Sequence, residues 1–277
     1  MTLRLGDRLV ALAYNSISIR SPLGKILKSV RRRWISPPPP PNTIRQTFDA
    51  LCKDHNPVTF IQVGSNDGVA SDPLREFIVR GDFRGVLVEP VPYLFERLLC
   101  TYKEVSGIFL ENVAVAATSG ERDFYYLRPT DDPFLPPWYD KLGSFRREVI
   151  LRNLDVIPSI PELLMSIRVQ CRTIQQLCER HSITRPDLIH IDAEGYDFEI
   201  IKSIDFSTLG PVVLLYEHKH LGISGRLECR AYVSEQGYDT LEIGDDTLCM
   251  RRAVSHSNAA NTFRELRRAR WFPKGSN

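Results

Sequence analysis

Residues 60–68 read Phe60-Ile61-Gln62-Val63-Gly64-Ser65-Asn66-Asp67-Gly68. The stretch begins with the apolar character of a buried strand and runs directly into a turn with two glycines, where a ligand can approach the backbone closely. Glu89 ends the next apolar run, a place where a carboxylate can accept both hydroxyl groups of a ribose. The G-x-x-x-G spacing differs from the G-x-G-x-x-G loop of dinucleotide-binding proteins, and Asp67 would repel a phosphate. The stretch therefore predicts a nucleoside site that suits a cationic ligand.

Outward from this loop, short apolar runs alternate with helical patterns, which is typical of a parallel sheet covered by helices. We expect strands over residues 58–63, 85–89, 107–115, 187–192 and 212–217. We expect helices over residues 73–80, 93–102, 174–181, 198–204 and 227–236, followed by a closing hairpin that ends at Arg251. The alternation predicts an α/β fold.

One segment, residues 128–168, departs from this alternation and is rich in proline, tryptophan, tyrosine and arginine. In open α/β sheets, ligands bind at the carboxyl ends of the strands, and insertions there form lids or acceptor pockets. We therefore expect an insertion that faces the substrate. The alternative is a structural excursion that contacts no ligand.

The net charge of +2 over 277 residues hides two parts of opposite sign. Residues 1–36 carry eight Lys and Arg side chains against Asp7 alone, so their charge is +7 and the remaining 241 residues carry −5. Apolar residues within this segment recur at helical spacing, which predicts a basic amphipathic helical arm. The arm would lie on an anionic membrane, on the protein's own core or on the second subunit of a homodimer. A basic, acid-poor start is also typical of an organellar transit peptide.

The five prolines at residues 37–41 predict a stiff linker, and with the entry helix after them this part covers residues 37–57. At the other end, residues 253–277 form a basic tail that we interpret as a solvated helix. The body with charge −5 offers no broad electrostatic footprint for nucleic acid, so we expect no nucleic-acid partner.

Composition excludes further classes of protein. Apolar residues make up 43% of the chain, but no apolar run approaches the roughly 20 residues that cross a bilayer. The six cysteines form no C-x-x-C pair, which indicates neither a zinc motif nor a redox motif. We therefore expect a cytoplasmic protein with reduced thiols, one that can associate with a membrane through its arm.

Five blocks of sequence occur in a characteristic order, at residues 63–68, 88–90, 112–114, 191–195 and 217–218. They read Val-Gly-Ser-Asn-Asp-Gly, Val-Glu-Pro, Asn-Val-Ala, Ile-Asp-Ala-Glu-Gly and Glu-His. With these blocks the chain resembles FkbM-type S-adenosylmethionine-dependent methyltransferases over residues 58–252. The resemblance implies S-adenosylmethionine as cofactor and a class I, Rossmann-like methyltransferase fold. Its sheet would be mostly parallel and seven-stranded, with an antiparallel last strand and helices on both faces.

The resemblance also implies a set of cofactor-binding residues: Gln62, Gly64, Ser65, Asn66, Asp67, Gly68, Glu89, Pro90, Asn112 and Val113. Within this set the glycine loop would wrap the methionine and ribose portions of the cofactor. Glu89 would bind the ribose hydroxyls, and Asn112 with Val113 would lie beside the adenine. The chain departs from the family at Gln62, where Asp is usual, and at His190, where Lys is frequent.

A hydroxyl acceptor is a poor nucleophile unless a general base removes its proton during the attack. If the expected strands are correct, the side chains that converge at the carboxyl end of the sheet are Asp192, Glu194, Glu217 and His218. We predict His218 as the base, oriented by Asp192 or Glu217, with Glu194 holding the acceptor or capping the next helix. A structural role for His218 at a strand end is the alternative.

A divalent metal is the competing chemistry at this edge of the sheet. Mixed oxygen and nitrogen ligands are available from Asp192, Asp197, His218 and His220. Their spacing matches no established metal motif, so the sequence predicts no metal.

The leading hypothesis is an S-adenosylmethionine-dependent O-methyltransferase that acts on a hydroxyl of a sugar, glycolipid or secondary metabolite. The acceptor would be a small molecule or a glycan. The alternative is a peripheral membrane- or partner-docking protein that uses the nucleoside-binding fold as a scaffold. A nicotinamide-dependent oxidoreductase is disfavoured because the G-x-G-x-x-G loop is missing.

Overall fold

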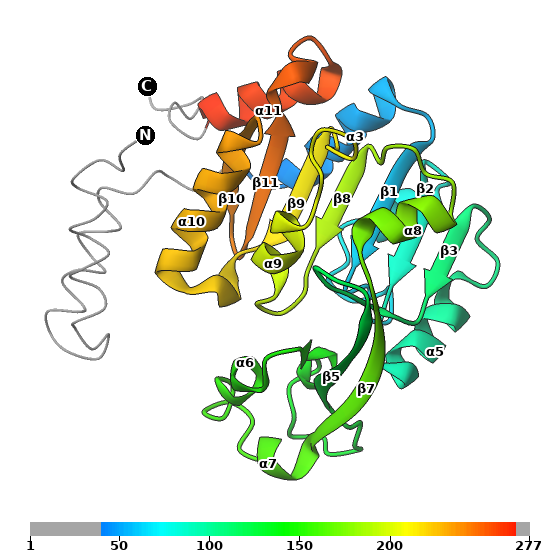
Figure 1. The fold of residues 1–277 in the computed structure, drawn as a ribbon, viewed down its shortest axis with the longest axis vertical. Coiled ribbons are helices and arrows are strands. Elements are labelled where there is room, and N and C mark those ends of the chain that lie inside the picture. The colour runs from blue at the N-terminus through cyan, green and yellow to red at the C-terminus, as the bar shows by residue number, and fades with distance from the viewer. Residues whose placement is uncertain (1–39, 270–277) are drawn as a thin grey trace, which may run out of the picture.

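The computed structural model describes residues 40–269 (Figure 1). The predicted helix of the basic arm, residues 1–36, and the last residues of the C-terminal tail lie outside the described residues. Within residues 40–269, no helix is both long enough and apolar enough to span a bilayer.

The central sheet has seven strands in the order β10-β11-β9-β8-β1-β2-β3. Their bounds are β1 Val58–Val63, β2 Phe83–Val88, β3 Ile108–Glu111, β8 Leu188–Ile191, β9 Val213–Glu217, β10 Tyr238–Ile243 and β11 Asp246–Arg251. In this sheet β11 alone runs against its neighbours, because β1, β2, β3, β8 and β9 pair in parallel. The predicted fold, with an antiparallel last strand, is confirmed.

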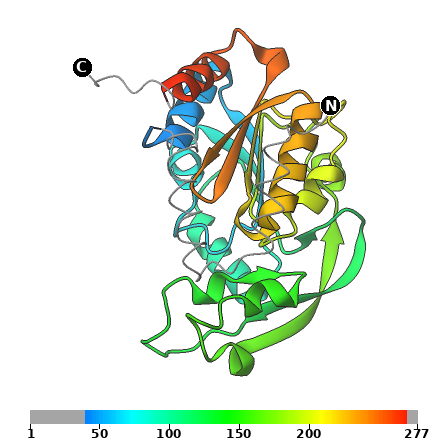
Figure 2. The same cartoon turned by 90° about the vertical axis from the view of Figure 1, so that its left-hand side faces the viewer.

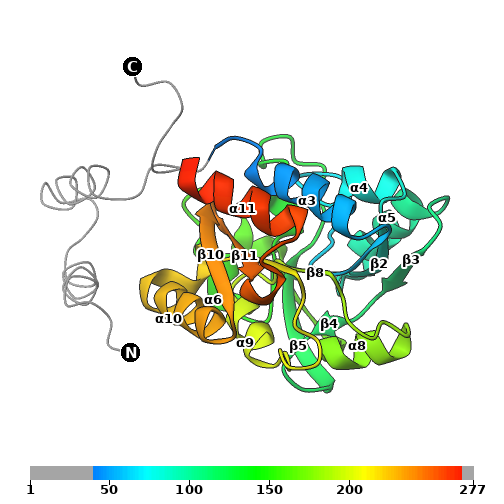
Figure 3. The same cartoon turned by 90° about the horizontal axis from the view of Figure 1, so that it is seen from above.

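Helices cover both faces of this sheet, which makes three layers (Figure 3). One face carries α3 Thr43–Asp54, α4 Arg75–Val79, α5 Pro92–Tyr102 and α11 Asn258–Ala269; the other carries α8 Ile174–Arg180, α9 Asp197–Lys202 and α10 Gly222–Glu235. Stacked rings of Phe77 and Phe83, with centroids 4.9 Å apart, tie α4 to β2. Full burial of each such side chain stabilises the fold by about 1.5–3 kcal/mol.

The C-terminal segment is part of this core, so the prediction of a solvated tail is wrong for residues 258–269. Phe263 and Leu266 of α11 are buried, and α11 packs along α3. The Asp54 carboxylate at the end of α3 accepts hydrogen bonds from the backbone N–H groups of Asn258 and Ala259 at the start of α11. The basic side chains of α11 occupy the outer surface of a helix whose apolar face docks on its neighbours.

The predicted insertion is a small lobe with its own four-stranded sheet, β4-β7-β5-β6, below the central sheet (Figures 1 and 2). It comprises β4 Ala114–Val115, β5 Gly120–Leu127, the 3₁₀ turn η1 Tyr139–Lys141, β6 Gly143–Ser144, α6 Arg147–Leu151, α7 Ile160–Leu163 and β7 Leu164–Arg172. The excursion therefore begins at β4 rather than at residue 128. The expected strand 107–115 is divided at Asn112, whose side-chain amide donates hydrogen bonds to the carbonyls of Glu89 and Pro90.

Candidate active site

A cavity that opens to solvent lies where β1, β2 and β8 end. Central-sheet residues and the loops after them supply most of its wall: Val63, Gly64, Asn66, Val88, Glu89, Pro90, Val91, Val113, Asp192, Ala193 and Glu194. The lobe closes the other side with Phe124, Lys141, Gly143 and Phe145. The cavity is thus built between the sheet and the insertion.

Gly64 is required by the approach of another strand. Its φ is +78°, and a Cβ atom there would lie 1.9 Å from the carbonyl oxygen of Asp192. The N–H groups of Gly64 and Ser65 both donate to the Val88 carbonyl, and the N–H of Asp192 donates to the Val63 carbonyl. These bonds join the ends of β2, β1 and β8 and place Asp192 directly beside the glycine loop.

Gly68 and Ser65 support the loop without lining the cavity. A Cβ atom on Gly68, whose φ is +69°, would lie 2.4 Å from the Tyr102 ring of α5. The Ser65 hydroxyl accepts a hydrogen bond from the N–H of Val88 at 3.1 Å. The second glycine is therefore required by helix packing rather than by close approach of a ligand.

Glu89 is the buried acid of the cavity, with 3% of its surface exposed. Its two carboxylate oxygens accept hydrogen bonds from the N–H groups of Asn66, at 2.9 Å, and Val91, at 2.8 Å. Burial raises the pKa of Glu89 to about 7, and the nearby Asp67 charge adds to the shift. Each oxygen keeps a further lone pair, so the fixed carboxylate can still accept two ligand hydroxyls.

Asp67 is neutralised by the insertion. Lys141 Nζ lies 2.8 Å from its carboxylate, which also accepts hydrogen bonds from the N–H groups of Val69 and Ala70. Although burial acts in the other direction, the charge and hydrogen bond of Lys141 hold the pKa of Asp67 below its usual value. The negative charge that Asp67 brings to the glycine loop is therefore paired with a basic side chain of the lobe.

Gln62 and Asn112 also lie outside the cavity wall. Gln62 is buried, and its Nε2 donates to the Asp72 carboxylate at 3.1 Å. Of the ten predicted cofactor residues, those that line the cavity are Gly64, Asn66, Glu89, Pro90 and Val113, and those that shape the loops behind it are Gln62, Ser65, Asp67, Gly68 and Asn112.

Acidic side chains crowd the wall after β8. Asp192 and Glu194 line the cavity, while the Asp197 carboxylate accepts hydrogen bonds from the N–H groups of Ala193 and Gly195 and so fixes the turn between them. Burial, followed by repulsion from Glu194 and Asp197, raises the pKa of Asp192 well above its ordinary value. Burial also raises the pKa of Asp197 to about 7. A cationic ligand at this wall would relieve the repulsion.

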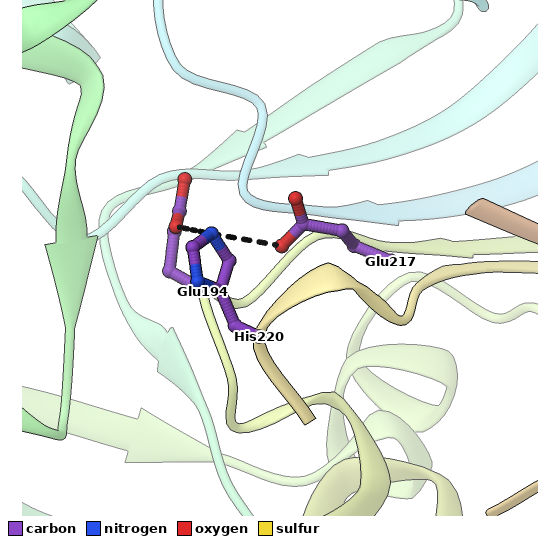
Figure 4. Close-up of side chains that lie close together, drawn as sticks. All are labelled: Glu194, Glu217 and His220. Atoms are coloured by element: carbon purple, nitrogen blue, oxygen red, sulfur yellow. Dashed lines mark ion pairs between the residues drawn. The ribbon is translucent and has the colours of Figure 1, made fainter. Parts of the chain in front are cut away.

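Behind Glu194 lies a second carboxylate together with a histidine (Figure 4). His220 Nε2 is 3.0 Å from Glu194 Oε2 and 3.8 Å from Glu217 Oε2. Burial, then repulsion from Asp192 and Glu194, raises the pKa of Glu217 to about 11. Neither Glu217 nor His220 lines the cavity, so Glu194 is the member of this group that faces it.

His218 points away from this group. Its Nδ1 lies 2.9 Å from the Thr247 hydroxyl on β11, and it does not line the cavity. Burial, together with the charge of Arg226, lowers the pKa of His218. The structure thus places His220, and not the predicted His218, beside the acidic residues.

Comparison with known proteins decides the family. A sequence model of the methyltransferase FkbM domain matches residues 62–240, about two thirds of the chain. The chain belongs to this family. The match includes every residue of the cavity wall and the whole lobe. Curated protein sequences gave no match.

Solved structures of methyltransferases resemble the FkbM domain more distantly. The methyltransferase FkbM from Methylobacillus flagellatus is 14% identical with a TM-score of 0.45, and the match covers 70% of this chain but only 43% of that protein. The O-methyltransferase TomG from Streptomyces achromogenes, solved with S-adenosylmethionine, is 12% identical with a TM-score of 0.40 over 76% of this chain and 79% of its own. Aeropyrum pernix fibrillarin is 11% identical with a TM-score of 0.37 over 75% of each chain.

The lobe of the FkbM domain forms hydrogen bonds with the backbone of Glu194 and His220. The Ser144 hydroxyl donates to the Glu194 carbonyl at 2.8 Å, and an Arg152 guanidinium N–H donates to the His220 carbonyl at 3.2 Å. Sequence reasoning missed these two residues, and it missed Lys141. The basic and hydroxyl side chains of the insertion indicated that it could contact acidic groups, but which groups they contact depends on the tertiary structure.

Proposed function

We propose that the protein transfers a methyl group from S-adenosylmethionine to a hydroxyl group of a small molecule or glycan. The observation that carries this proposal is one cavity, inside the matched FkbM domain, that holds Glu89 on one side of β1 and Asp192 on the other. A nucleoside and a sulfonium are the two parts of the cofactor that these side chains would recognise.

The residues present fit this cofactor. Glu89 is fixed by two backbone N–H groups and has acceptor capacity left for ribose hydroxyls, and Pro90 and Val113 offer an apolar surface for a base. The repulsion around Asp192 favours a ligand that carries positive charge. When bound there, the cofactor would supply a methyl group on a good leaving group, so the main task of the protein is alignment.

A carboxylate that faces the cavity is the proton acceptor in this proposal. The hydroxyl oxygen forms its bond to the methyl carbon as the carbon–sulfur bond breaks, and the hydroxyl proton passes to Asp192 or Glu194. His218 does not fit this role, since its side chain points away from the cavity and forms a hydrogen bond with the Thr247 hydroxyl. A cavity lined by carboxylates and by Phe145 also suits a polyol, because sugars offer hydroxyl donors and flat C–H faces.

Calorimetry with S-adenosylhomocysteine tests the cofactor part of the proposal. We expect wild type to bind and Glu89→Ala to lose most of the affinity, because the ribose hydroxyls lose their acceptor. Glu96→Ala, which removes an exposed glutamate of α5, is the matched control and should bind as wild type does. Absence of binding by wild type, or equal binding by Glu89→Ala, would contradict the proposal.

The acceptor can be sought by transfer of a labelled methyl group to lysate fractions. A fraction labelled by wild type and not by Asp192→Asn contains the acceptor, because the variant keeps the shape of the side chain and loses the proton acceptor. Labelling by both proteins would contradict a role for Asp192 in proton removal.

The separation of positive and negative charge along the chain favours a second role, membrane binding, for the N-terminal segment. Residues 1–36 carry +7, and we propose that they hold a cytoplasmic enzyme at an anionic membrane, where lipid-linked acceptors are found. Membrane binding without binding of S-adenosylhomocysteine would instead favour the docking protein that uses the fold as a scaffold. Homodimer formation through the same segment stays a prediction that sedimentation can test.

A further inference from the structure

Three side chains at the carboxyl ends of β8 and β9 form a compact ligand-like group (Figure 4). One oxygen of Glu194, one oxygen of Glu217 and one ring nitrogen of His220 all lie within 4.8 Å of one another. They come from two strand ends and the 3₁₀ turn η2 Lys219–Leu221, so the central sheet holds them in place.

We propose that Glu194, Glu217 and His220 bind a divalent metal ion whose open coordination positions face the cavity and receive a hydroxyl of the acceptor. The ion site itself rests on the geometry of the three side chains. The role of the ion toward the acceptor rests on the proposed methyl transfer. This inference revises the expectation from the sequence, which assigned no metal and considered a set of ligands that shares only His220 with this one.

The buried oxygen of Glu217 points independently to a missing ligand. Glu217 is 8% exposed, and its Oε2 has no hydrogen-bond partner among the described residues. A buried carboxylate oxygen without a partner is costly, and buried charges are normally paired or coordinate metals. Figure 4 shows this oxygen directed toward His220 and Glu194. A cation between the three atoms would satisfy it.

Among the described residues, no lysine or arginine side chain pairs with this oxygen of Glu217. Within residues 40–269, no Lys or Arg forms an ion pair with Glu194 or Glu217, and the contact that both carboxylates make is with the imidazole of His220. Lys219, the nearest lysine in sequence, pairs with Asp245 on the surface at 3.7 Å. The group therefore keeps the acceptor capacity that a metal needs.

The donor set indicates the kind of ion. Two carboxylate oxygens and one imidazole nitrogen suit Mn²⁺, Fe²⁺, Co²⁺ or Zn²⁺ better than Ca²⁺, which prefers oxygen ligands throughout. Three protein ligands leave at least one position open for an exogenous oxygen, as in catalytic metal sites. Glu194 lines the cavity, so that position opens toward the proposed acceptor. Because Glu194 would be bound to the ion, Asp192 is the carboxylate that remains to accept the hydroxyl proton of the acceptor.

The lobe holds two of the ligands by their backbone. Ser144 donates to the carbonyl of Glu194, and Arg152 donates to the carbonyl of His220. Such outer contacts orient ligands and are typical of functional metal sites. The insertion would thus couple the acceptor pocket to the metal site.

Titration with Mn²⁺, followed by the electron paramagnetic resonance signal of the free ion, tests the inference on full-length protein stripped with a chelator. Mn²⁺ is chosen because the exposed Cys100 thiol would compete for Zn²⁺. We expect one ion per chain, and an affinity at least tenfold weaker in Glu217→Gln and in His220→Asn. Glu111→Gln is the control, because Glu111 is an equally buried carboxylate that contacts His181 at 2.7 Å but is already paired with Arg180, so it should bind no ion.

Two results would overturn the inference: absence of Mn²⁺ binding by wild type, or wild-type affinity in both Glu217→Gln and His220→Asn. Thermal unfolding of each variant establishes that it is folded, and two variants are used so that one unfolded protein does not end the test. S-adenosylhomocysteine is titrated into the same samples. If wild type binds S-adenosylhomocysteine but not Mn²⁺, this inference is overturned and the proposed function stands. If wild type binds Mn²⁺ but not S-adenosylhomocysteine, the metal site is supported and the proposed function is contradicted.

Discussion

Glu89 gives the proposed cofactor site a dependence on pH. Its pKa is raised to about 7, mainly by burial and then by the charge of Asp67, and the charged residues that line the cavity with it are Lys141, Asp192 and Glu194. Ribose hydroxyls donate to the ionised carboxylate, so binding favours the form that predominates above pH 7. We expect the affinity for S-adenosylhomocysteine to be about tenfold lower at pH 6 than at pH 8, measured by calorimetry.

Glu89→Gln provides the control for this dependence, since its side chain does not titrate. The variant should bind weakly at both pH values, because an amide has less acceptor capacity and meets the N–H groups of Asn66 and Val91. A wild-type affinity that is constant from pH 6 to pH 8 would contradict the role of Glu89.

A comparison of Gly64 with Gly81 distinguishes two reasons for a glycine, the lack of space for a side chain and a positive φ. Both have φ near +79°, but a Cβ atom on Gly64 would lie 1.9 Å from a backbone oxygen, whereas one on Gly81 would meet nothing within 4 Å. We expect Gly64→Ala to lower the free energy of unfolding by more than about 3 kcal/mol and Gly81→Ala by about 1 kcal/mol. Urea unfolding measures both, and equal losses would contradict the steric argument.

The sequence located the acidic side chains of the cavity wall better than the histidine beside them. Asp192 and Glu194, expected at the carboxyl end of the sheet, line the cavity, because the end of a buried parallel strand is easily located. The prediction of His218 as the base rested on its place directly after the strand that was expected to end at Glu217. The strand ends at Glu217, and the 3₁₀ turn has a period of three, so Glu217 meets His220 while His218 turns to β11.

At the scale of elements, β1, β2, β8 and β9 were predicted to within about two residues because they are continuous apolar runs flanked by turns, whereas the expected strand 107–115 ran four residues past the end of β3. The lobe was not resolved into strands. In β5, the residues Glu121, Arg122 and Asp123 are exposed, and their charges hide an antiparallel pairing with β7 that becomes evident only when both strands are placed. Antiparallel strands with one solvated face carry a weaker signal than buried ones.

The ion pair between η1 of the lobe and the glycine loop should be energetically coupled. Lys141 and Asp67 are 2.8 Å apart, and their side chains are only 15% and 19% exposed. A double-mutant cycle with Lys141→Met and Asp67→Asn should give a coupling of about 1–2 kcal/mol in the free energy of unfolding. The exposed pair Lys202–Glu199, at 2.9 Å, is the control and should give less than about 0.5 kcal/mol. Equal couplings would mean that the lobe is not held by this pair.

At the scale of the whole molecule, the cavity lies between two bodies, the sheet with its helices and the lobe. One of the two apolar clusters of the sheet extends into the lobe at Phe124 and Val169, and the lobe has a smaller cluster of its own around Leu127, Ile150 and Ile160. Residues from both bodies line the cavity, and the lobe also braces Glu194 and His220. Sequence changes in the lobe can therefore alter the acceptor pocket while the cofactor loop on the sheet stays the same.

The separation of charge along the chain predicts where membrane affinity resides. Residues 1–39 carry +7, and the chain from Pro40 onward carries −5. Each basic residue near an anionic bilayer contributes about 1 kcal/mol at moderate salt, so full-length protein should co-sediment with phosphatidylserine vesicles and be released by 0.5 M salt, about three times physiological ionic strength. A chain that begins at Pro40 keeps the hydrogen bond from Thr43 to the Pro40 carbonyl, and it should bind S-adenosylhomocysteine unchanged but fail to sediment. Neutral phosphatidylcholine vesicles are the control, and equal sedimentation of the two chains would remove the membrane role of the segment.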